Sequence, residues 1–577
     1  DNTRPELEKA YVAPGTQVEE TLASIWSEVL DIDDIGIHDN FFALGGDSIR
    51  SIQVMALAKE KGLGFSIQQL FEFQTIHQLA QTLEVGASAE LARRTEPFSL
   101  ISEQDRAALP AEVEDAYPLT SLQSGMLYHM ELRPAGAPVY HNVNSFHVRA
   151  RLHVPALQRA IQRVIDRHAI MRTTFELTRY SQPLQLVYKS SPIEVFEGDD
   201  LSNLSAEEQQ EVITRFMRSE YEHAFDLTRP PLVRFSVHRR SPETFQYTLT
   251  ENHAISDGWS TTSMFAEIFK YYFAELNNEP LLEDPLPSFT FRDFVQLEQE
   301  ALNSPECQNF WKEKLRDFTP MRLPRWPNGH ANGETKKHGF IGLVFGSGLY
   351  EGLKSLAQSA EVPFKTVLLA AHMKVMSITC AQPDVMTALA TNGRPEETGG
   401  DRVRGLFINM VPFRLCISDG SWFELVKETF AAEREMLPYR RYPLAAIQQN
   451  YNTQRLLETA FNFVHFHSLE GAVRSGNVEL ISSGTKDMAD TSFTLNTGFT
   501  IGITSLTKPR LEMGLEYDAT ELGEEQIKTI VEIQLTGPSG AEETVTTSDT
   551  GKWNLSVTEP GEYTIAIDPD SLPDDVE

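Results

Sequence analysis

The chain has 577 residues, a formal net charge of −32 and a hydrophobic share of 41%. Its length suggests about two to four domains, and its hydrophobic share is enough to bury large cores. The acidic balance argues against binding to nucleic acid or to an anionic membrane surface, because both need clustered Lys and Arg.

Three cysteines, Cys307, Cys380 and Cys416, stand far apart and show no metal-ligand spacing. We therefore expect no metal site and no disulfide framework, but free thiols in a reducing compartment, the cytoplasm. No run of about 18 apolar residues occurs, so no membrane span is predicted. The chain begins at Asp1 with neither Met nor a signal-peptide pattern, which suggests an excised piece of a longer protein.

The first 85 residues have the pattern of a small all-α bundle of four helices. Residues 16–30 place apolar side chains at helical spacing behind a capping-box pattern. Further helices are predicted to begin at Ser48 and to cover residues 76–83. Residues 86–113 are polar and aperiodic, which indicates a linker.

Residues 114–530 mix strand-like alternation with amphipathic helices, and their length suggests an α/β domain with lobes at about 114–285 and 286–530. The clearest predicted elements are strands over 139–151 and 245–255 and helices over 155–168 and 260–276. A last helix is expected at 521–533. Residues 531–577 alternate in period two between Gly, Pro and Asp turns, which is typical of a short β-rich tail, Ig-like or a fused piece.

The first chemical signal is the segment DNFFALGGDSI at residues 39–49. Its glycines, Gly46 among them, permit a tight turn, after which Asp47 and Ser48 begin a helix. A phosphate ester on Ser48 would face free N–H groups and the positive end of the helix dipole. Taken alone, the segment also fits a turn that only caps a helix.

With the helix and loop ahead of it, this segment resembles the phosphopantetheine attachment site of the peptidyl carrier domains of nonribosomal peptide synthetases. The resemblance covers residues 14–85 and implies a 4′-phosphopantetheine cofactor bound covalently to Ser48. It also implies two partners: a phosphopantetheinyl transferase, which attaches the cofactor, and an upstream adenylation domain.

The second chemical signal is NHAISDGWS at residues 252–260, between a predicted strand and a predicted helix. A His at a strand end, on a turn closed by Asp-Gly, can present its imidazole in a cleft. Imidazole titrates near neutral pH and is suited to general-base work. A lone His is, however, more often structural.

This segment resembles the HHxxxDG motif of condensation domains, which have the two-lobed fold of CoA-dependent acyltransferases such as chloramphenicol acetyltransferase. Five other segments resemble the family's motifs and occur in the family's order. They are YPLTSLQSGM (117–126), RHAIMRTTF (167–175), NGRP (392–395), GLFINMVP (405–412) and YDA (517–519).

The resemblance implies a role for each matching residue. His253 would meet the attacking amine, as a base or as a positioning group. Asp257 would pair with an arginine, for which Arg172 and Arg394 are both candidates. Gly258 would allow close backbone approach, and its N–H would face the carbonyl oxygen that gains charge.

The function that the resemblance implies is amide-bond formation in nonribosomal peptide synthesis. The amine on a downstream acceptor carrier domain would attack a peptidyl thioester carried by Ser48. One enzymatic alternative is epimerisation of the carrier-bound residue. Asn252 replaces the first His of the motif and cannot titrate, which also leaves room for a non-catalytic recruitment platform.

Overall fold

The computed structural model describes most of the chain. The described residues are 4, 10–83, 94–132, 139–281, 285–287, 289–326, 338–397, 399–418, 420–451, 456–465, 479–486, 493–503, 509–530, 533–536, 542–545 and 564–566. Within them, no helix combines the length and the apolar content that crossing a bilayer requires. No group of three or more His, Cys, Asp or Glu side chains there could hold a metal ion, and the three cysteines are unbonded.

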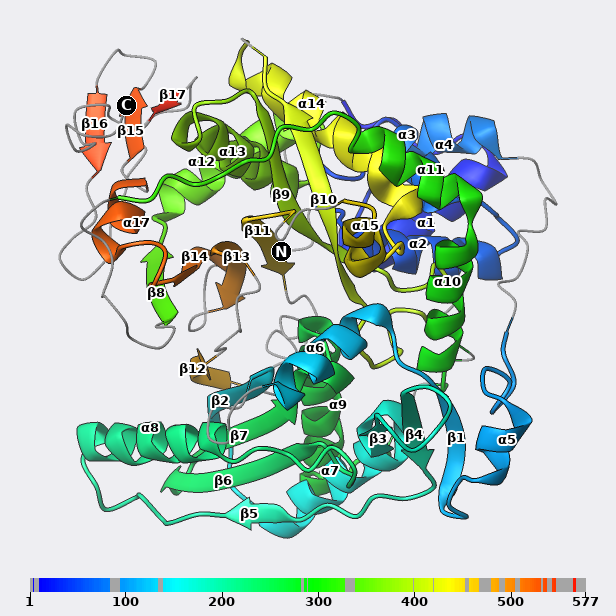
Figure 1. The fold of residues 1–577 in the computed structure, drawn as a ribbon, viewed down its shortest axis with the longest axis vertical. Helices are drawn as coiled ribbons and strands as arrows, with labels where there is room; N and C mark the ends of the chain where they lie inside the picture. Colours follow the sequence, from blue (N-terminus) through cyan, green and yellow to red (C-terminus); the bar gives the residue numbers. More distant parts are fainter. Residues whose placement is uncertain are drawn as a thin grey trace.

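The N-terminal residues form a bundle of four helices (Figure 1). They are α1 (Gln17–Leu30), α2 (Ser48–Glu60), α3 (Ile67–Glu72) and α4 (Ile76–Thr82). The predicted capping box is present at the start of α1, where the Thr16 N–H donates to the Glu19 carboxylate over 3.1 Å. The sequence did not locate α3, because six residues are too few for helical periodicity to show.

The first lobe of the larger domain is built on a five-stranded sheet in the order β12-β2-β7-β6-β5, with a second sheet in the order β1-β4-β3 beside it. Its strands are β1 (Val113–Pro118), β2 (His141–Arg149), β3 (Thr173–Glu176), β4 (Leu184–Tyr188), β5 (Val195–Glu197), β6 (Val233–Ser241), β7 (Thr244–Asn252) and, from later in the chain, β12 (Glu479–Lys486). Its helices are α5 (Glu103–Ala107), α6 (Ser121–Glu131), α7 (Val154–Arg167), α8 (Ala206–Glu222), α9 (Gly258–Leu276) and the 3-10 turns η1 (Ala169–Arg172) and η2 (His253–Ile255). The fully buried Tyr247 packs on Phe265 and Phe269 of α9, which anchors this helix on the sheet.

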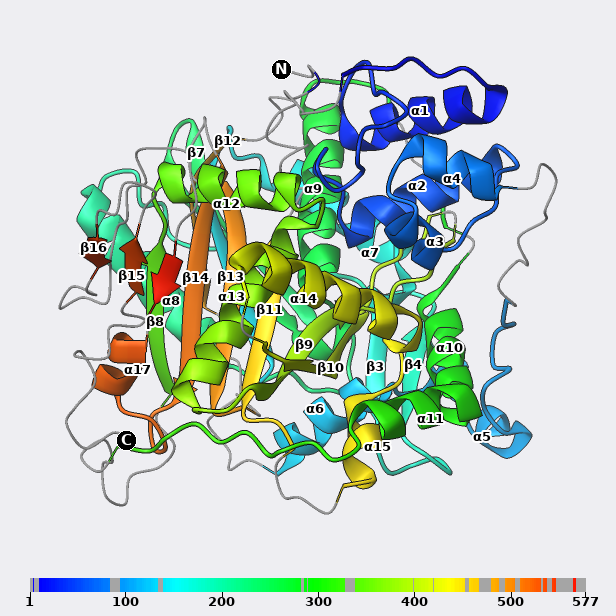
Figure 2. The ribbon, with the colours of Figure 1, turned by 90° about the horizontal axis from the view of Figure 1, so that it is seen from above.

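The second lobe is built on a six-stranded sheet in the order β10-β9-β11-β13-β14-β8 (Figure 2). Its strands are β8 (His338–Val344), β9 (Asp384–Asn392), β10 (Ile408–Cys416), β11 (Thr459–His465), β13 (Leu495–Ile503) and β14 (Pro509–Asp518). Its helices are α10 (Phe291–Asn303), α11 (Pro305–Lys314), α12 (Ser347–Ser359), α13 (Phe364–Thr379), α14 (Trp422–Met436), η3 (Leu437–Tyr439), α15 (Leu444–Gln449) and α17 (Glu524–Ile530). The predicted fold class, a helical bundle followed by a two-lobed α/β domain, is therefore confirmed.

Two predicted domain boundaries need correction. Strand β12 (Glu479–Lys486) belongs to the second half of the chain but pairs antiparallel with β2 in the first lobe, so the lobes do not divide cleanly at residue 285. Two strands this far apart in the sequence leave no local pattern from which their pairing could be predicted. The described part of the predicted linker also carries α5 and packs on the first lobe, where Asp105 accepts a hydrogen bond from the Ser181 N–H over 2.9 Å.

The β-rich C-terminal residues contribute a small antiparallel sheet. It consists of β15 (Ile533–Thr536), β16 (Glu542–Val545) and β17 (Thr564–Ala566) in the order β16-β15-β17. Residues 546–563 and 567–577 of the predicted β-rich tail lie outside the described residues. The helix expected at 521–533 is shorter and covers Glu524–Ile530.

A buried carboxyl group joins α10 to the start of α6. Glu298 is 7% exposed and accepts hydrogen bonds from the Ser121 N–H (2.7 Å) and hydroxyl (3.1 Å). Burial raises the pKa of Glu298 to about 7, although both hydrogen bonds act in the opposite direction. The folded protein therefore holds this proton more tightly than the unfolded chain does.

We predict that Glu298→Gln stabilises the protein at alkaline pH. The favourable contribution of the protonated Glu298 is complete below the ordinary carboxyl pKa and is lost as the pH rises through about 7. Relative to the parent, the variant should gain on the order of 2–3 kcal/mol between pH 5 and pH 8. Thermal unfolding at both pH values measures this, with the exposed Glu300→Gln as control. Parallel pH profiles for parent and variant would contradict the prediction.

Candidate active site

His253 lies in the short turn η2 directly after β7, and hydrogen bonds from two of its backbone N–H groups hold this turn. The His253 N–H donates to the Tyr140 carbonyl over 2.8 Å. The Asn252 side-chain oxygen accepts a hydrogen bond from the Ala254 N–H over 3.0 Å. The strand was predicted to run to residue 255, but it ends at Asn252 because the Asn side chain caps the turn.

The imidazole of His253 is half-buried and oriented by one carbonyl group. Its Nδ1 lies 2.7 Å from the Ser256 carbonyl oxygen. Because a carbonyl oxygen can only accept a hydrogen bond, Nδ1 carries the proton of the neutral ring. The neutral ring therefore presents Nε2 with a free lone pair, which is the form that can take a proton from an amine.

Asn252 faces the protein interior. It is 2% exposed, and its Nδ2 lies 3.9 Å from the Met130 sulfur atom. Its side-chain oxygen caps the turn that carries His253, and its Nδ2 faces α6.

A buried pair of amides supports this turn from below. The Gln123 Nε2 donates to the Ala254 carbonyl over 2.9 Å, and the Gln123 Oε1 accepts from the Gln185 Nε2 over 3.1 Å. Both glutamines are fully buried. Sequence reasoning missed their role, although Gln123 lies inside the conspicuous segment 117–126, because its partners are distant in the chain.

Asp257 and Arg394 form a buried ion pair. The Arg394 Nη2 lies 2.8 Å and 3.1 Å from the two Asp257 carboxylate oxygens and donates to the Ser260 hydroxyl over 2.7 Å. The same carboxylate accepts from the N–H groups of Ser260 (2.7 Å) and Phe407 (3.1 Å). Arg394 is fully buried, and its guanidinium lies 4.2 Å from the centre of the Phe407 ring.

The other candidate arginine lies elsewhere. Arg172 pairs with Glu114 over 2.7 Å and donates to the carbonyl of Ile165 over 3.2 Å. It therefore braces the junction of α7 and β1 and does not contact Asp257. The structure brings Arg394 alone of the two candidates to the His253 turn.

Gly258 is the first residue of α9, the helix that follows this turn. Asp257 caps α9 by taking the Ser260 N–H. In the described part of the chain, the Gly258 N–H has no hydrogen-bond partner, and Gly258 is half-buried. A helix of 19 residues concentrates partial positive charge at this end, so Gly258 can donate to an oxygen that gains negative charge.

Ser48 is exposed at the first position of α2. The expectation that a phosphate on Ser48 would face free N–H groups is wrong for Ile49 and Arg50, because the Asp47 carboxylate already accepts from both, each over 2.9 Å. Gly46 makes the tight turn possible, since a Cβ atom there would lie 2.3 Å from the Phe41 ring.

The surroundings of Ser48 fit an attached phosphodiester. Its hydroxyl is exposed at a helix N-terminus, where the dipole favours negative charge. The Arg50 guanidinium lies close by, donating to the Gly45 carbonyl over 2.7 Å. The chain would therefore hold 4′-phosphopantetheine by a bond to Ser48, with Asp47 fixing the helix start.

The N-terminal bundle packs against the second lobe beside α14 (Figures 1 and 2). Phe42 and Phe71 contact Phe430 of α14, with ring centres 5.6 Å and 6.1 Å apart. The polar rim includes an ion pair of Lys59 with Glu397 at 2.9 Å.

Two further rim contacts fall on either side of Ser48 in the sequence. The Gln358 side chain of α12 donates to the Ala43 carbonyl over 3.2 Å, and the Gln53 side chain donates to Asp401 over 3.0 Å. These contacts hold the residues on both sides of the first turn of α2 against the second lobe. We refer to the aromatic contact and its polar rim as the docking interface.

Comparison with known families agrees with this geometry. The model of the condensation domain matches residues 113–536. The chain belongs to the condensation domain family. The model of the phosphopantetheine attachment site matches residues 20–83, so a carrier domain with covalent 4′-phosphopantetheine precedes the condensation domain.

The relatives are synthetases much longer than this chain. It is 34% identical over 529 residues to the AMB antimetabolite synthetase AmbE of Pseudomonas aeruginosa, covering 90% of this chain and 24% of AmbE. It is 27% identical over 468 residues to malpinin synthetase of Mortierella alpina, covering 76% of this chain and 6% of that synthetase.

Solved structures share the fold of the condensation domain. The first condensation domain of the calcium-dependent antibiotic synthetase superposes with a TM-score of 0.58 at 16% identity, covering 71% of this chain and 93% of that one. The condensation domain of the Monacolin K polyketide synthase MokA superposes with a TM-score of 0.58 at 15% identity, covering 73% and 96% of the two chains.

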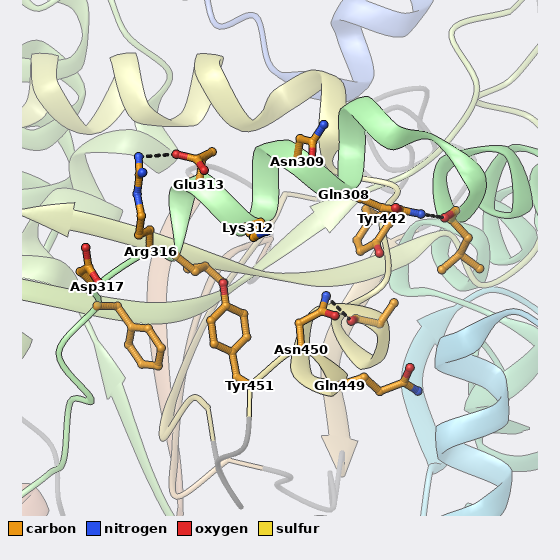
Figure 3. Close-up of a pocket in the computed structure, with 14 residues that line it drawn as sticks. Gln308, Asn309, Lys312, Glu313, Arg316, Asp317, Tyr442, Gln449, Asn450 and Tyr451 are labelled. Atoms are coloured by element: carbon orange, nitrogen blue, oxygen red, sulfur yellow. Dashed lines mark hydrogen bonds and ion pairs between the residues drawn. The ribbon is translucent and has the colours of Figure 1, made fainter.

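A separate pocket of about 990 Å³ opens on the condensation domain between α11 and α15 (Figure 3). Tyr442 and Tyr451 contribute aromatic surface, and charged side chains such as Lys312 and Arg316 line it as well. Residues 252–260 do not line this pocket, so it lies apart from the His253 turn.

We predict that Arg394→Met destabilises the condensation domain by about 3–5 kcal/mol, because it leaves the buried Asp257 carboxylate without its counter-charge. Adding Asp257→Asn should restore part of that loss, since the unpaired charge is then removed. Urea unfolding of the single and double variants measures both effects. Arg239→Met, at an exposed ion pair, is the matched control and should change little. Additive losses in the double variant would contradict the prediction.

Proposed function

We propose that this chain forms an amide bond in nonribosomal peptide synthesis. The condensation domain would transfer a peptidyl group from the carrier domain at residues 1–85 to the amine of an aminoacyl group on a downstream acceptor carrier. The proposal is supported by the position of the His253 turn, which leads directly into the start of α9, where Asp257 pairs with Arg394 of the second lobe. Trp259 of the same helix contacts Asp401, which also binds Gln53 in the docking interface.

The residues of the chain divide the work between proton transfer and charge stabilisation. When bound, 4′-phosphopantetheine supplies a thiol that holds the acyl group as a thioester. His253 Nε2 accepts the proton of the attacking amine as the C–N bond forms, and returns it to the sulfur as the C–S bond breaks. The Gly258 N–H donates to the carbonyl oxygen while that oxygen carries negative charge.

Positioning contributes more than proton transfer in this proposal. General-base help is worth about 10²–10⁴-fold, whereas holding two reactants in the correct geometry can supply roughly 7–11 kcal/mol. The contacts that position the two reactants are therefore more important to the rate than proton transfer by the imidazole.

The proposal needs partners that are not part of this chain. It spans 24% of AmbE and 6% of malpinin synthetase, and other domains of a synthetase would complete the cycle. An adenylation domain would supply the activated amino acid, a downstream carrier would present the amine, and a phosphopantetheinyl transferase would modify Ser48. The three unbonded cysteines fit a reducing compartment such as the cytoplasm.

The substitution at Asn252 does not favour a silent recruitment platform. Its side chain forms the cap of the His253 turn and is 2% exposed. An Asn can make this hydrogen bond without titrating, so its presence is compatible with a turn that still presents the imidazole of His253. Amide formation therefore remains the function that the geometry supports best.

We predict that His253→Ala lowers amide formation about 10²-fold or more. The carrier domain is loaded with acyl-pantetheine by a phosphopantetheinyl transferase, an aminoacyl thioester is added as acceptor, and product is quantified by mass spectrometry. Ser48→Ala is the control and should gain no pantetheine mass. Unchanged yield with His253→Ala would favour the recruitment platform, and a D-epimer formed without acceptor would favour epimerisation.

A further inference from the structure

One loop of the second lobe contacts both the carrier domain and the helix that follows His253. We call residues 395–397 and 399–404, between β9 and β10, the bridging loop. Next to its first residue, Arg394 is paired with Asp257 at the start of α9. At its other end, Arg404 lies 3.3 Å from Glu267, further along the same helix.

The anchor at Glu267 is buried and charged. Arg167 and His168 also bind this carboxylate, over 3.0 Å and 2.7 Å. Burial would raise the pKa of Glu267, but the hydrogen bond from His168 and the charge of Arg404 outweigh it and lower the pKa to about 2. The bridging loop is therefore held to α9 at both ends by ionic contacts with little access to water.

The same loop carries two of the polar contacts of the docking interface. Glu397 pairs with Lys59 over 2.9 Å, and Asp401 accepts a hydrogen bond from Gln53 over 3.0 Å. Both partners lie on α2, the helix that begins at Ser48. These two contacts link the position of the bridging loop to the position of the carrier domain on the second lobe.

Asp401 joins the two sets of contacts. Its carboxylate binds Gln53 of the carrier domain, while its backbone carbonyl accepts the Trp259 indole N–H over 2.8 Å. Trp259 is the second residue of α9 and follows Asp257 and Gly258 directly. The first turn of α9 is in turn tied to the His253 turn, where the hydroxyls of Thr261 and Ser256 lie 2.8 Å apart.

We propose that the bridging loop couples the seating of the carrier domain to the geometry of the His253 turn, with Asp401 and Trp259 as positioning residues. This inference rests on the proposed amide formation and adds a regulatory feature to it. A seated carrier domain holds Asp401, Asp401 holds Trp259, and the first turn of α9 then keeps His253 and Gly258 aligned. When the carrier domain leaves, the turn loses one of its supports.

The contacts of the docking interface are weak enough for the carrier domain to bind and leave. Its ion pair and hydrogen bonds are partly exposed, and contacts of that kind are individually weak. Its centre is a small aromatic contact of Phe42 and Phe71 with Phe430. Such an interface can form and separate in each cycle, which a carrier domain that visits several partners requires.

The test uses soluble acyl donors that are not attached to Ser48. In the full chain with Ser48→Ala, a soluble acyl-pantetheine thioester and a soluble aminoacyl thioester serve as substrates, and amide product is measured. Lys59→Glu, Glu397→Lys and Gln53→Ala should each lower the rate about fivefold, although the donor is not attached to the carrier domain. The charge-swapped double variant Lys59→Glu with Glu397→Lys should recover most of the rate.

Trp259→Phe should abolish the effect of the docking variants on the soluble-donor rate, because it removes the indole N–H that donates to the Asp401 carbonyl. In the Trp259→Phe background, Lys59→Glu should cause no further loss. Arg402→Ala is the matched control in the same loop, since Arg402 donates to the Pro285 carbonyl instead, and it should leave the rate unchanged. Fluorine NMR of the chain labelled with 5-fluorotryptophan gives a readout without catalysis: Lys59→Glu should shift the Trp259 signal, and Arg402→Ala should not.

The coupling and the proposed function would fail in different ways. If the docking variants leave both the soluble-donor rate and the Trp259 signal unchanged, the coupling is overturned while amide formation stands. If they lower the rate equally in the Trp259→Phe background, the coupling does not pass through this residue and the proposal is overturned. If the Ser48→Ala chain forms no amide from soluble substrates although it is folded, the proposed function fails and the coupling fails with it.

Discussion

The buried ion pair between Asp257 and Arg394 is the interaction that holds the rest of the site in place. Removing two charges from water costs several kcal/mol each, so such a pair depends on close geometry and on further hydrogen bonds to both partners. Here the carboxylate also accepts two backbone N–H groups, and the guanidinium also reaches Ser260 and a backbone carbonyl. Because Asp257 starts α9 and Arg394 follows β9, satisfying this pair fixes one lobe relative to the other.

The active-site turn is built mainly from backbone atoms and neutral amides. A carbonyl selects the tautomer of His253, and the Asn252 amide caps its turn. Beneath them, Gln123 and Gln185 satisfy each other and hold the Ala254 carbonyl. In the proposed reaction, a neutral support of this kind would leave the imidazole as the group of the turn that changes charge during proton transfer, and the surrounding geometry would stay constant.

The contact between the carrier domain and the condensation domain combines two requirements that usually conflict. It must be specific enough to bring Ser48 to one place, and weak enough to release it. An aromatic centre with a sparse polar rim meets both. Since Glu397 and Asp401 of that rim belong to the bridging loop, the same residues that orient the carrier domain also contact the structure around His253.

Features that depend on neighbouring residues could be predicted from the amino-acid sequence. The capping box of α1, the start of α2 at Ser48 and the end of β7 near His253 follow from local hydrogen bonds and spacing. Which arginine meets Asp257 became clear from the folded chain alone, since the two residues lie 137 positions apart. The fold also placed β12 in the first lobe and gave Asp401 its two partners. The difference arises because a local pattern specifies which groups need partners, whereas chain topology decides which distant groups can reach them.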